Sequence, residues 1–321
     1  MMSRGDLRAL RWQDAGDDPL IPHPFLSPVI ADPAVISSVD SPDGQWHLFA
    51  HSAWGIHRYT SSDGLAWRDR GICVRHAMRP WVYREAGTWH LLYERYPAFG
   101  LALTVLPRRQ WRSWIEMRSS VDLRRWQHPR ILLEPSLAWH HRQGSGSAVG
   151  NPCLVKANRK YRLYYSASLV RVPDCGFNEP ASIGLAEADA LGGPYVPHPR
   201  PLLEADAGDP LMNLSPGCIR VMQLADGWAG FQNGISVNAG ISTSAILLLS
   251  STDGLCWERA SPAPIVSPGA PWKYSHVYAS CPVLRGDDEI LLYYNGRSDW
   301  KLKDGKESIG LARGRPSEGR A

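Results

Sequence analysis

Ala31-Asp32-Pro33-Ala34-Val35-Ile36 is the first copy of a motif that recurs five times in this chain of 321 residues. Each copy consists of a polar or small residue, a proline and an apolar segment that reads as a strand. Proline costs no ladder hydrogen bond at the first position of a strand, so it can open one. The five copies begin at Asp32, Arg79, Asn151, Ser215 and Cys281. This recurrence indicates an architecture built from similar units.

Similar segments follow the openers. A second strand is rich in aromatic residues, as in Trp46-His47-Leu48-Phe49-Ala50. A third strand leads into a turn such as Ser61-Ser62-Asp63-Gly64-Leu65-Ala66-Trp67, or repeats as Ser182–Ala186 and Ser308–Ala312. Asp-Gly favours a tight turn between antiparallel strands, and we expect the tryptophan after it to pack between neighbouring sheets.

These units predict the fold. Four antiparallel strands per unit, repeated five times, indicate an all-β, five-bladed β-propeller whose four-stranded antiparallel blades surround a central funnel. Residues 1–321 would form a single domain, with blades starting near residues 32, 79, 151, 215 and 281. A two-sheet sandwich also has many short strands, but it does not explain why the same opener recurs.

Composition excludes several function classes. The formal net charge is only +4, and the basic stretches 108–112 and 124–126 lie beside tryptophan, so we expect no nucleic-acid partner. We find no segment that reads as a signal peptide or a membrane span, which predicts no membrane partner. The six cysteines form no CxxC pair and read as mostly buried free thiols. We therefore expect a cytoplasmic protein, while its oligomeric state stays open.

The openers and turns resemble those of the five-bladed propeller glycosidases. This superfamily includes family 43 arabinanases and xylosidases, family 32 fructosidases, family 117 galactosidases and family 130 mannoside phosphorylases. Ala31–Ile36 is similar to their first-blade motif, and Ser-x-Asp-Gly-x-x-Trp is similar to their blade-edge turn. The resemblance extends from about Pro24 to Ala312 and implies a carbohydrate site in the central funnel.

The resemblance also implies roles for the openers. Asp32 matches the position of a general base or nucleophile in that superfamily. The chain departs from the pattern at the next two openers: Arg79 replaces an aspartate of families 43 and 32, and Asn151 replaces their glutamate acid. The openers therefore leave the identity of the acid open.

Glycoside hydrolysis generally needs two carboxyl groups, so a second one must come from elsewhere. The second strand of each blade runs antiparallel to the first and ends at the rim where the openers begin. This geometry predicts a ring of polar residues: His51, Glu94, Ser166, Ser168, Asn233, Asn295 and Arg297. Glu94 is the acidic residue of this ring and the leading candidate for the acid, although it could instead pair structurally with Arg79 or Arg95. Asp174 and Glu179 compete with it, because they lie in a long loop of the third blade.

Other residues are candidates for substrate binding. His276 precedes the fifth opener; family 117 members use a histidine as their acid, but a structural histidine is an equally good interpretation. Arg79, Arg95, Lys273 and Arg297 predict a basic funnel, which would suit an acidic sugar or phosphate. Aromatic residues that could stack on sugar rings are Trp54, Tyr96, Phe99, Trp139 and Trp272.

Together these features predict a glycoside hydrolase that acts on an oligosaccharide or glycoside by inversion. Asp32 would be the base and Glu94 or Glu179 the acid, with His51, Trp54, Arg79, Asn151, Asp174, His276 and Arg297 binding substrate. We expect no cofactor and no metal, because no cluster of oxygen ligands has metal spacing. The alternatives are a phosphorylase or transglycosylase, and a non-catalytic carbohydrate-binding propeller.

Overall fold

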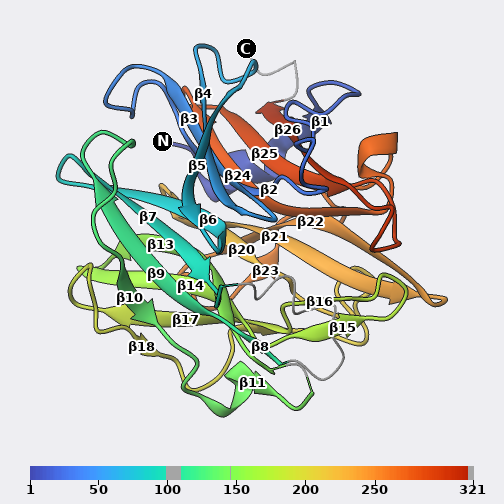
Figure 1. Cartoon of the computed structure of the whole chain (residues 1–321). Helices are drawn as coiled ribbons and strands as arrows, with labels where there is room; N and C mark the ends of the chain where they lie inside the picture. The colour runs from blue at the N-terminus through green and yellow to red at the C-terminus, as the bar shows by residue number, and fades with distance from the viewer. Residues whose placement is uncertain (99–109, 145, 317–321) are drawn as a thin grey trace.

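The computed structural model describes residues 1–98, 110–144 and 146–316, and it is nearly all β (Figure 1). Its α-helix is the six-residue α1 (Arg4–Ala9), and two 3₁₀ turns cover Ala138–His140 and Pro271–Lys273. The prediction of a β protein built from small antiparallel sheets is confirmed. No helix in the described ranges is long and apolar enough to cross a membrane.

The strands fall into antiparallel groups that follow chain order. The first contains β2 (Ala31–Ile36), β3 (Trp46–Ser52), β4 (Gly55–Ser61) and β5 (Arg68–Arg75). The second contains β6 (Ala77–Glu85), β7 (Thr88–Arg95), β9 (Trp114–Ser120) and β10 (Arg130–Leu133). The third contains β13 (Val149–Ala157), β14 (Lys160–Ala167), β17 (Ser182–Ala188), β18 (Val196–Pro197) and β19 (Leu203–Glu204).

The last part of the chain forms an eight-stranded sheet with two antiparallel halves. One half is β20 (Ile219–Leu224), β21 (Gly227–Asn238), β22 (Ile241–Ser251) and β23 (Glu258–Arg259). The other is β24 (His276–Arg285), β25 (Glu289–Arg297), β26 (Glu307–Pro316) and the N-terminal β1 (Leu10–Asp14). A single parallel pair, Ser244 with His276, joins the halves. No repeated motif predicts β1, which pairs with β26 and so brings residues near the two ends of the chain together.

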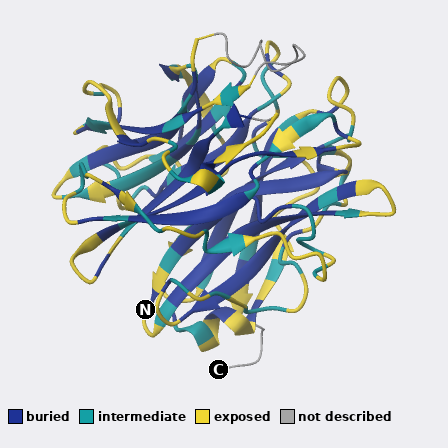
Figure 2. Ribbon diagram, turned by 90° about the horizontal axis from the view of Figure 1, so that it is seen from below, coloured by how far each residue is buried: buried dark blue, intermediate teal, exposed yellow. Residues whose placement is uncertain are grey.

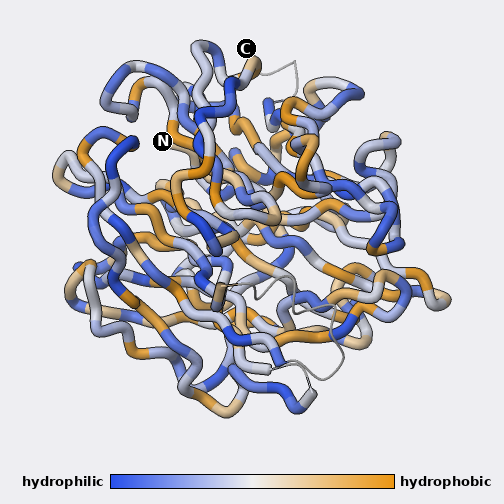
Figure 3. Tube along the Cα trace, viewed as in Figure 1, coloured by the Kyte–Doolittle hydropathy of each residue, from blue (hydrophilic) through white to orange (hydrophobic). Residues whose placement is uncertain are grey.

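The first strands of the groups pack against one another. β2 contacts β6 and β24, β6 contacts β13, β13 contacts β20, and β20 contacts β24. Buried residues follow these strands, whereas the exposed ones gather in the peripheral loops (Figure 2). Hydrophobic residues likewise follow the strands, and hydrophilic stretches occupy the turns (Figure 3). The hydrophobic core thus consists of layers between neighbouring groups.

Three openers have a backbone conformation that is rare outside glycine. Asp32, Arg79 and Asn151 have φ angles of 53°, 56° and 49°, and the strand register shifts beside each of them. A positive φ costs a non-glycine residue free energy, and β-bulges of this kind redirect side chains near functional sites. These bulges aim the three side chains away from the regular pleat.

The openers of the fourth and fifth groups differ from this pattern. In the fourth group, Gly217 has the left-handed conformation before β20, with a φ of 60°. Its proline, Pro216, therefore precedes the left-handed residue, whereas in the first three groups the proline follows it. Pro282 lies within β24, which begins at His276 and shifts register between Val277 and Ser280. Pro282 is tolerated there because the pairing on one side of β24 is limited to the single residue His276.

The turn tryptophans pack between groups, as predicted. Trp67 contacts Tyr293, Trp126 contacts Phe49 and Trp257 contacts Tyr164, each edge-on with ring centroids 5.7 to 6.2 Å apart. The Tyr293 and Tyr164 hydroxyls also donate to the carbonyls of the turn glycines Gly64 and Gly254. These contacts link each turn to the second strand of another group.

The six cysteines are unpaired, and Cys153, Cys175, Cys218 and Cys281 are buried. This agrees with the interpretation as mostly buried free thiols.

Candidate functional site

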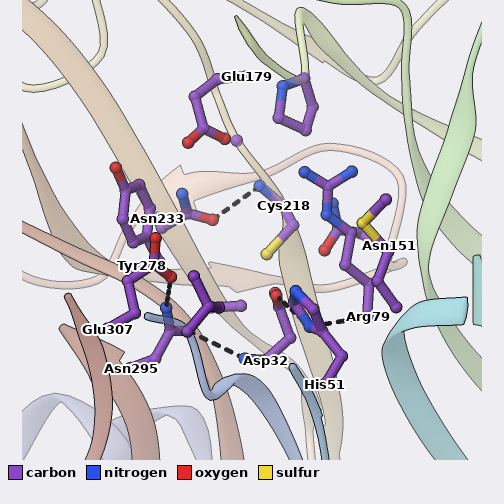
Figure 4. A pocket seen from close by; sticks show the side chains of 15 residues that line it. Asp32, His51, Arg79, Asn151, Glu179, Cys218, Asn233, Tyr278, Asn295 and Glu307 are labelled. Atoms are coloured by element: carbon purple, nitrogen blue, oxygen red, sulfur yellow. Dashed lines mark hydrogen bonds and ion pairs between the residues drawn. The ribbon is translucent and has the colours of Figure 1, made fainter. Parts of the chain in front are cut away.

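A polar pocket lies where the first strands begin (Figure 4). Residues at or near the starts of the first strands line it: Asp32, Arg79, Asn151, Gly217, Cys218, Tyr278 and Ala279. His51, Asn233 and Asn295, near the ends of second strands, line it as well. Ser166 adds a hydrogen bond to the Gly217 carbonyl, at 2.8 Å. The predicted convergence is present in part. Openers of the first four copies and the second-strand residues His51, Asn233 and Asn295 line the cavity, whereas the predicted fifth opener at Cys281 and the ring residues Glu94, Ser166, Ser168 and Arg297 do not.

Asp32 is buried in the wall of this pocket. One carboxylate oxygen lies 3.2 Å from His51 Nδ1, and the Asp32 backbone N–H donates to Asn295 Oδ1. Burial lowers the pKa of His51, an effect that the nearby Asp32 charge opposes. His51 is therefore neutral at physiological pH, and it flanks the Asp32 carboxylate without adding a positive charge.

Glu94 lies behind the pocket rather than in its lining. It is fully buried, and Arg79 Nη1 donates to its carboxylate at 2.8 Å. Trp111 Nε1 donates to the other oxygen at 3.4 Å. The alternative interpretation, a structural pair with Arg79, is the arrangement found. A proton donor at this position would have to break a buried ion pair, so its geometry suits a role in holding Arg79.

Glu179 reaches the pocket from the end of β16 (Phe177–Glu179), which pairs with β15 (Val170–Val172). In Figure 4 it lies across the pocket from Asp32 and His51. The pKa of its carboxyl is raised to about 8, mainly by burial; the Arg79 charge opposes this rise, and the Glu307 and Asp32 charges add to it. Glu179 is therefore mainly protonated at neutral pH, the state that a general acid needs.

Glu307 also lines the pocket and was missed by the sequence analysis. Its carboxylate accepts hydrogen bonds from Asn295 Nδ2 at 3.0 Å and from Arg297 Nη1 at 3.2 Å. Burial raises its pKa, and the Arg297 charge opposes the rise. One signal was available: Glu307 immediately precedes the repeated segment Ser308–Ala312, so it stands where a third strand leaves the rim.

His276 and Asp174 lie outside the pocket lining. His276 is fully buried, stacks on the Tyr278 ring at 5.4 Å and places Nε2 3.1 Å from Ser242 Oγ. Burial lowers its pKa to about 4. Asp174 accepts hydrogen bonds from the backbone N–H and the hydroxyl of Ser242. This geometry matches the structural interpretation of His276, which supports Tyr278 from behind.

The prediction of a basic funnel is wrong. Of its four cations, Arg79 lines the pocket and is paired with Glu94. Arg297 is engaged by Glu307 and two backbone carbonyls, Lys273 by Asp14 and a carbonyl, and Arg95 by Glu116. Carboxylates therefore neutralise the positive charge that the sequence predicts for the funnel.

The aromatic candidates divide by exposure. Trp139 stacks on Tyr165, Trp272 stacks on Tyr294, and Tyr96 is buried against Trp111, so these three serve packing. Trp54 is 56% exposed in the turn after β3 and donates its indole N–H to the Leu26 carbonyl. It stands three residues beyond His51. Phe99 lies outside the described residues.

Within the described ranges, no group of three or more His, Cys, Asp and Glu side chains is placed to hold a metal ion.

Comparisons with known proteins give a structural likeness without a sequence relative. No family model and no curated protein matches the chain. A family 117 glycoside hydrolase from Zobellia galactanivorans aligns over 97% of this chain and 92% of its own, with a TM-score of 0.62 and 16% identity. An N-acetylgalactosamine deacetylase from F. plautii aligns over 95% of both chains, with a TM-score of 0.62 and 14% identity.

A third solved structure is an α-L-arabinanase from Cellvibrio cellulosa, complexed with arabinohexaose. It aligns over 92% of both chains, with a TM-score of 0.58 and 15% identity. The structural neighbours include glycoside hydrolases of the five-bladed β-propeller type. At these identities the likeness establishes a shared fold, and the reaction has to be inferred from the pocket.

Proposed function

We propose that this chain is a glycosidase whose five strand groups are the blades of a propeller and whose polar pocket is its central funnel. Two observations support this arrangement. The contacts among β2, β6, β13, β20 and β24 run from group to group and back to the first. The pocket is lined by residues at or near the start of the first strand of each group.

The observation that carries the proposed reaction is the contrast between two carboxyl groups in one pocket. Asp32 lies beside the neutral His51, whereas Glu179 lies across the pocket with its pKa raised to about 8. Two carboxyl groups in one pocket, one of them kept protonated, are the requirement for acid–base cleavage of a glycosidic bond.

In the proposed inverting mechanism, Asp32 takes a proton from a water molecule as that water attacks the anomeric carbon. The bond from that carbon to the leaving oxygen breaks, and Glu179 gives its proton to that oxygen. Arg79, held by Glu94, places a fixed positive charge near the Asp32 carboxylate. The enzyme ends each cycle with Asp32 protonated and Glu179 ionised, and exchange with water restores both groups.

The rim favours an oligosaccharide over a single sugar. Trp54, three residues beyond the lining residue His51, presents an exposed ring whose indole N–H donates to the carbonyl of Leu26, which is 74% exposed. Ser27 holds the two loops together, because its hydroxyl accepts the Ala53 N–H and donates to the Val29 carbonyl. Two of the solved neighbours were determined with oligosaccharides, arabinohexaose and a blood group B trisaccharide.

A screen of nitrophenyl glycosides and natural oligosaccharides, with and without inorganic phosphate, tests this function. We expect at least one substrate to be cleaved at the same rate without phosphate, giving a product of inverted configuration by NMR. Cleavage that requires phosphate would make the chain a phosphorylase. Binding without cleavage by the wild type would make it a carbohydrate-binding propeller.

A further inference from the structure

Two polar atoms in the pocket have no hydrogen-bond partner within the described part of the chain. They are Asn151 Oδ1 and the Tyr278 hydroxyl. Asn151 is 3% exposed and Tyr278 is 7% exposed, so bulk water does not compensate them. Buried polar groups in proteins are nearly always paired, and an unpaired one costs about 1 to 3 kcal/mol. Both residues line the same cavity, and a ligand there would supply the missing partners.

The fold fixes both residues at opposite sides of the pocket. Asn151 occupies the strained bulge of β13, whereas Tyr278 occupies the bulge of β24, and Figure 4 shows them on opposite walls. The Tyr278 ring stacks flat on His276, whose Nε2 lies within hydrogen-bond distance of Ser242 Oγ. Burial and the Glu179 and Glu307 charges raise the pKa of Tyr278, so its hydroxyl keeps its proton and can donate.

The charges around the pocket favour an uncharged ligand. Glu94 pairs with Arg79 and Glu307 pairs with Arg297, so both nearby guanidinium charges are balanced. Asp32 lies beside His51, whose pKa is lowered by burial, so His51 adds no further positive charge. A sugar carboxylate or sulfate would also bring no proton to Asn151 Oδ1, whereas a sugar hydroxyl can both donate and accept.

We propose that Asn151 and Tyr278 determine specificity by hydrogen-bonding the hydroxyl groups of an uncharged sugar ring: Asn151 Oδ1 accepts from one hydroxyl, and the Tyr278 hydroxyl donates to another. This inference rests on the proposed function, since it names the substrate class of the same pocket. It adds Tyr278 to the site and names the atom with which the predicted binding residue Asn151 contacts the sugar.

The variants can be matched closely. Asn151→Gly removes the amide yet suits the left-handed backbone, and Asn158→Gly is its control, because Asn158 has a φ of 51° in an exposed hairpin turn. Tyr278→Phe removes one hydroxyl, and Tyr96→Phe is its control, because Tyr96 also carries a buried hydroxyl without a partner but does not line the pocket. All four are made in an Asp32→Asn background, so that bound sugar is not consumed.

Calorimetric titration would use arabinohexaose, blood group B trisaccharide and β-1,2-mannobiose as neutral probes and trigalacturonate as the acidic one. We expect a neutral probe to bind and trigalacturonate not to bind. Asn151→Gly and Tyr278→Phe should each weaken neutral binding about tenfold, and the controls by less than about twofold. Tyr278→Phe removes an unpaired buried hydroxyl, so it should not lower the melting temperature. A merely structural role for Tyr278 would predict a lower melting temperature.

Unchanged neutral binding in both pocket variants, or a preference for trigalacturonate, would overturn the specificity assignment while leaving a carbohydrate site in place. If no probe binds the Asp32→Asn protein, the proposed function falls, and the specificity assignment with it.

Discussion

At the scale of single residues, the surroundings of each carboxyl group separate its role from that of its neighbours. Asp32 lies beside a neutral histidine, Glu94 is ion-paired with Arg79, and Glu179 is desolvated across the pocket. Glu307 is held by Arg297 and Asn295. Glu179 therefore has the surroundings of a proton donor.

The loss of activity in Glu179→Gln should depend on the leaving group of the substrate. A natural sugar leaving group needs protonation, so its cleavage should slow by about 10² or more, whereas cleavage of a nitrophenyl glycoside should slow far less. Steady-state kinetics on both substrates measure the difference. Equal losses on both substrates would mean that Glu179 does not donate the proton. Glu94→Gln is expected to lower stability instead, because it leaves the partly buried Arg79 without its ion-pair partner.

The pH profile should report the Glu179 carboxyl. An acid is active only when protonated, so activity should fall as the pH rises through about 8. The Glu307 charge raises this pKa, so Glu307→Gln should move the alkaline limb to lower pH. A profile of kcat/KM for both proteins measures the shift. An unchanged or upward-shifted limb in the variant would contradict the assignment.

The sequence revealed part of this site. Asp32 stood in a recognisable opener, and the antiparallel return of the second strands placed His51, Asn233 and Asn295 correctly. Strand polarity cannot show which of several charged side chains a neighbour neutralises, so it predicts Glu94 as the leading candidate for the acid, whereas the structure pairs Glu94 with Arg79. Arg297 pairs with Glu307, and Lys273 pairs with Asp14. Neither carboxylate belongs to one of the five opener motifs, so the motifs do not predict these pairs.

At the scale of elements, turns fix how neighbouring strand groups pack, and bulges place the pocket side chains. The turn at Asp253 shows how: its Oδ1 accepts the backbone N–H groups of Leu255 and Cys256, while the Gly254 carbonyl accepts the Tyr164 hydroxyl from another group. Sequence predicted these turns because Asp and Gly have strong local preferences. It misplaced the fourth and fifth openers, since Gly217 and Tyr278 occupy the bulges there without a following proline.

Asp253→Ala should destabilise this turn. Losing the side-chain hydrogen bonds is expected to lower the free energy of unfolding by about 1 kcal/mol at pH 7. The Cys256 and Leu255 N–H groups hold the pKa of Asp253 below its ordinary 3.8, so the stabilisation is present above that pH and declines as the pH falls below it.

Urea unfolding at several pH values checks the Asp253 prediction, with Asp189→Ala as the control, because the Asp189 side chain is 92% exposed. A difference between wild type and Asp253→Ala that persists or grows at acid pH would contradict it.

At the scale of the whole molecule, the N-terminal strand completes the last group. β1 pairs with β26 along five residues, from Leu10 with Pro316 to Asp14 with Ala312. Trp12 packs edge-on against Phe231, in the neighbouring half of the sheet, and its ring lies over Gly314. The recurring openers predicted the repeated groups, but β1 follows no opener, so local sequence did not show that it belongs with β26.

Trp12→Ala should therefore loosen the connection between the two ends of the chain. Removing this partly buried ring is expected to cost about 3 kcal/mol. Arg11→Ala, on the exposed face of the same strand, should change stability by less than about 0.5 kcal/mol. Denaturant unfolding measures both, and equal effects would argue against a stabilising role for the Trp12 contacts.

The most direct test of a glycosidase centred on Asp32 is the turnover of Asp32→Asn on a glycoside that the wild type cleaves. We expect kcat to fall by about 10² to 10⁴, while calorimetry shows that the variant still binds the sugar and circular dichroism shows that it is folded. A folded Asp32→Asn protein that cleaves the glycoside at the wild-type rate would contradict the mechanism.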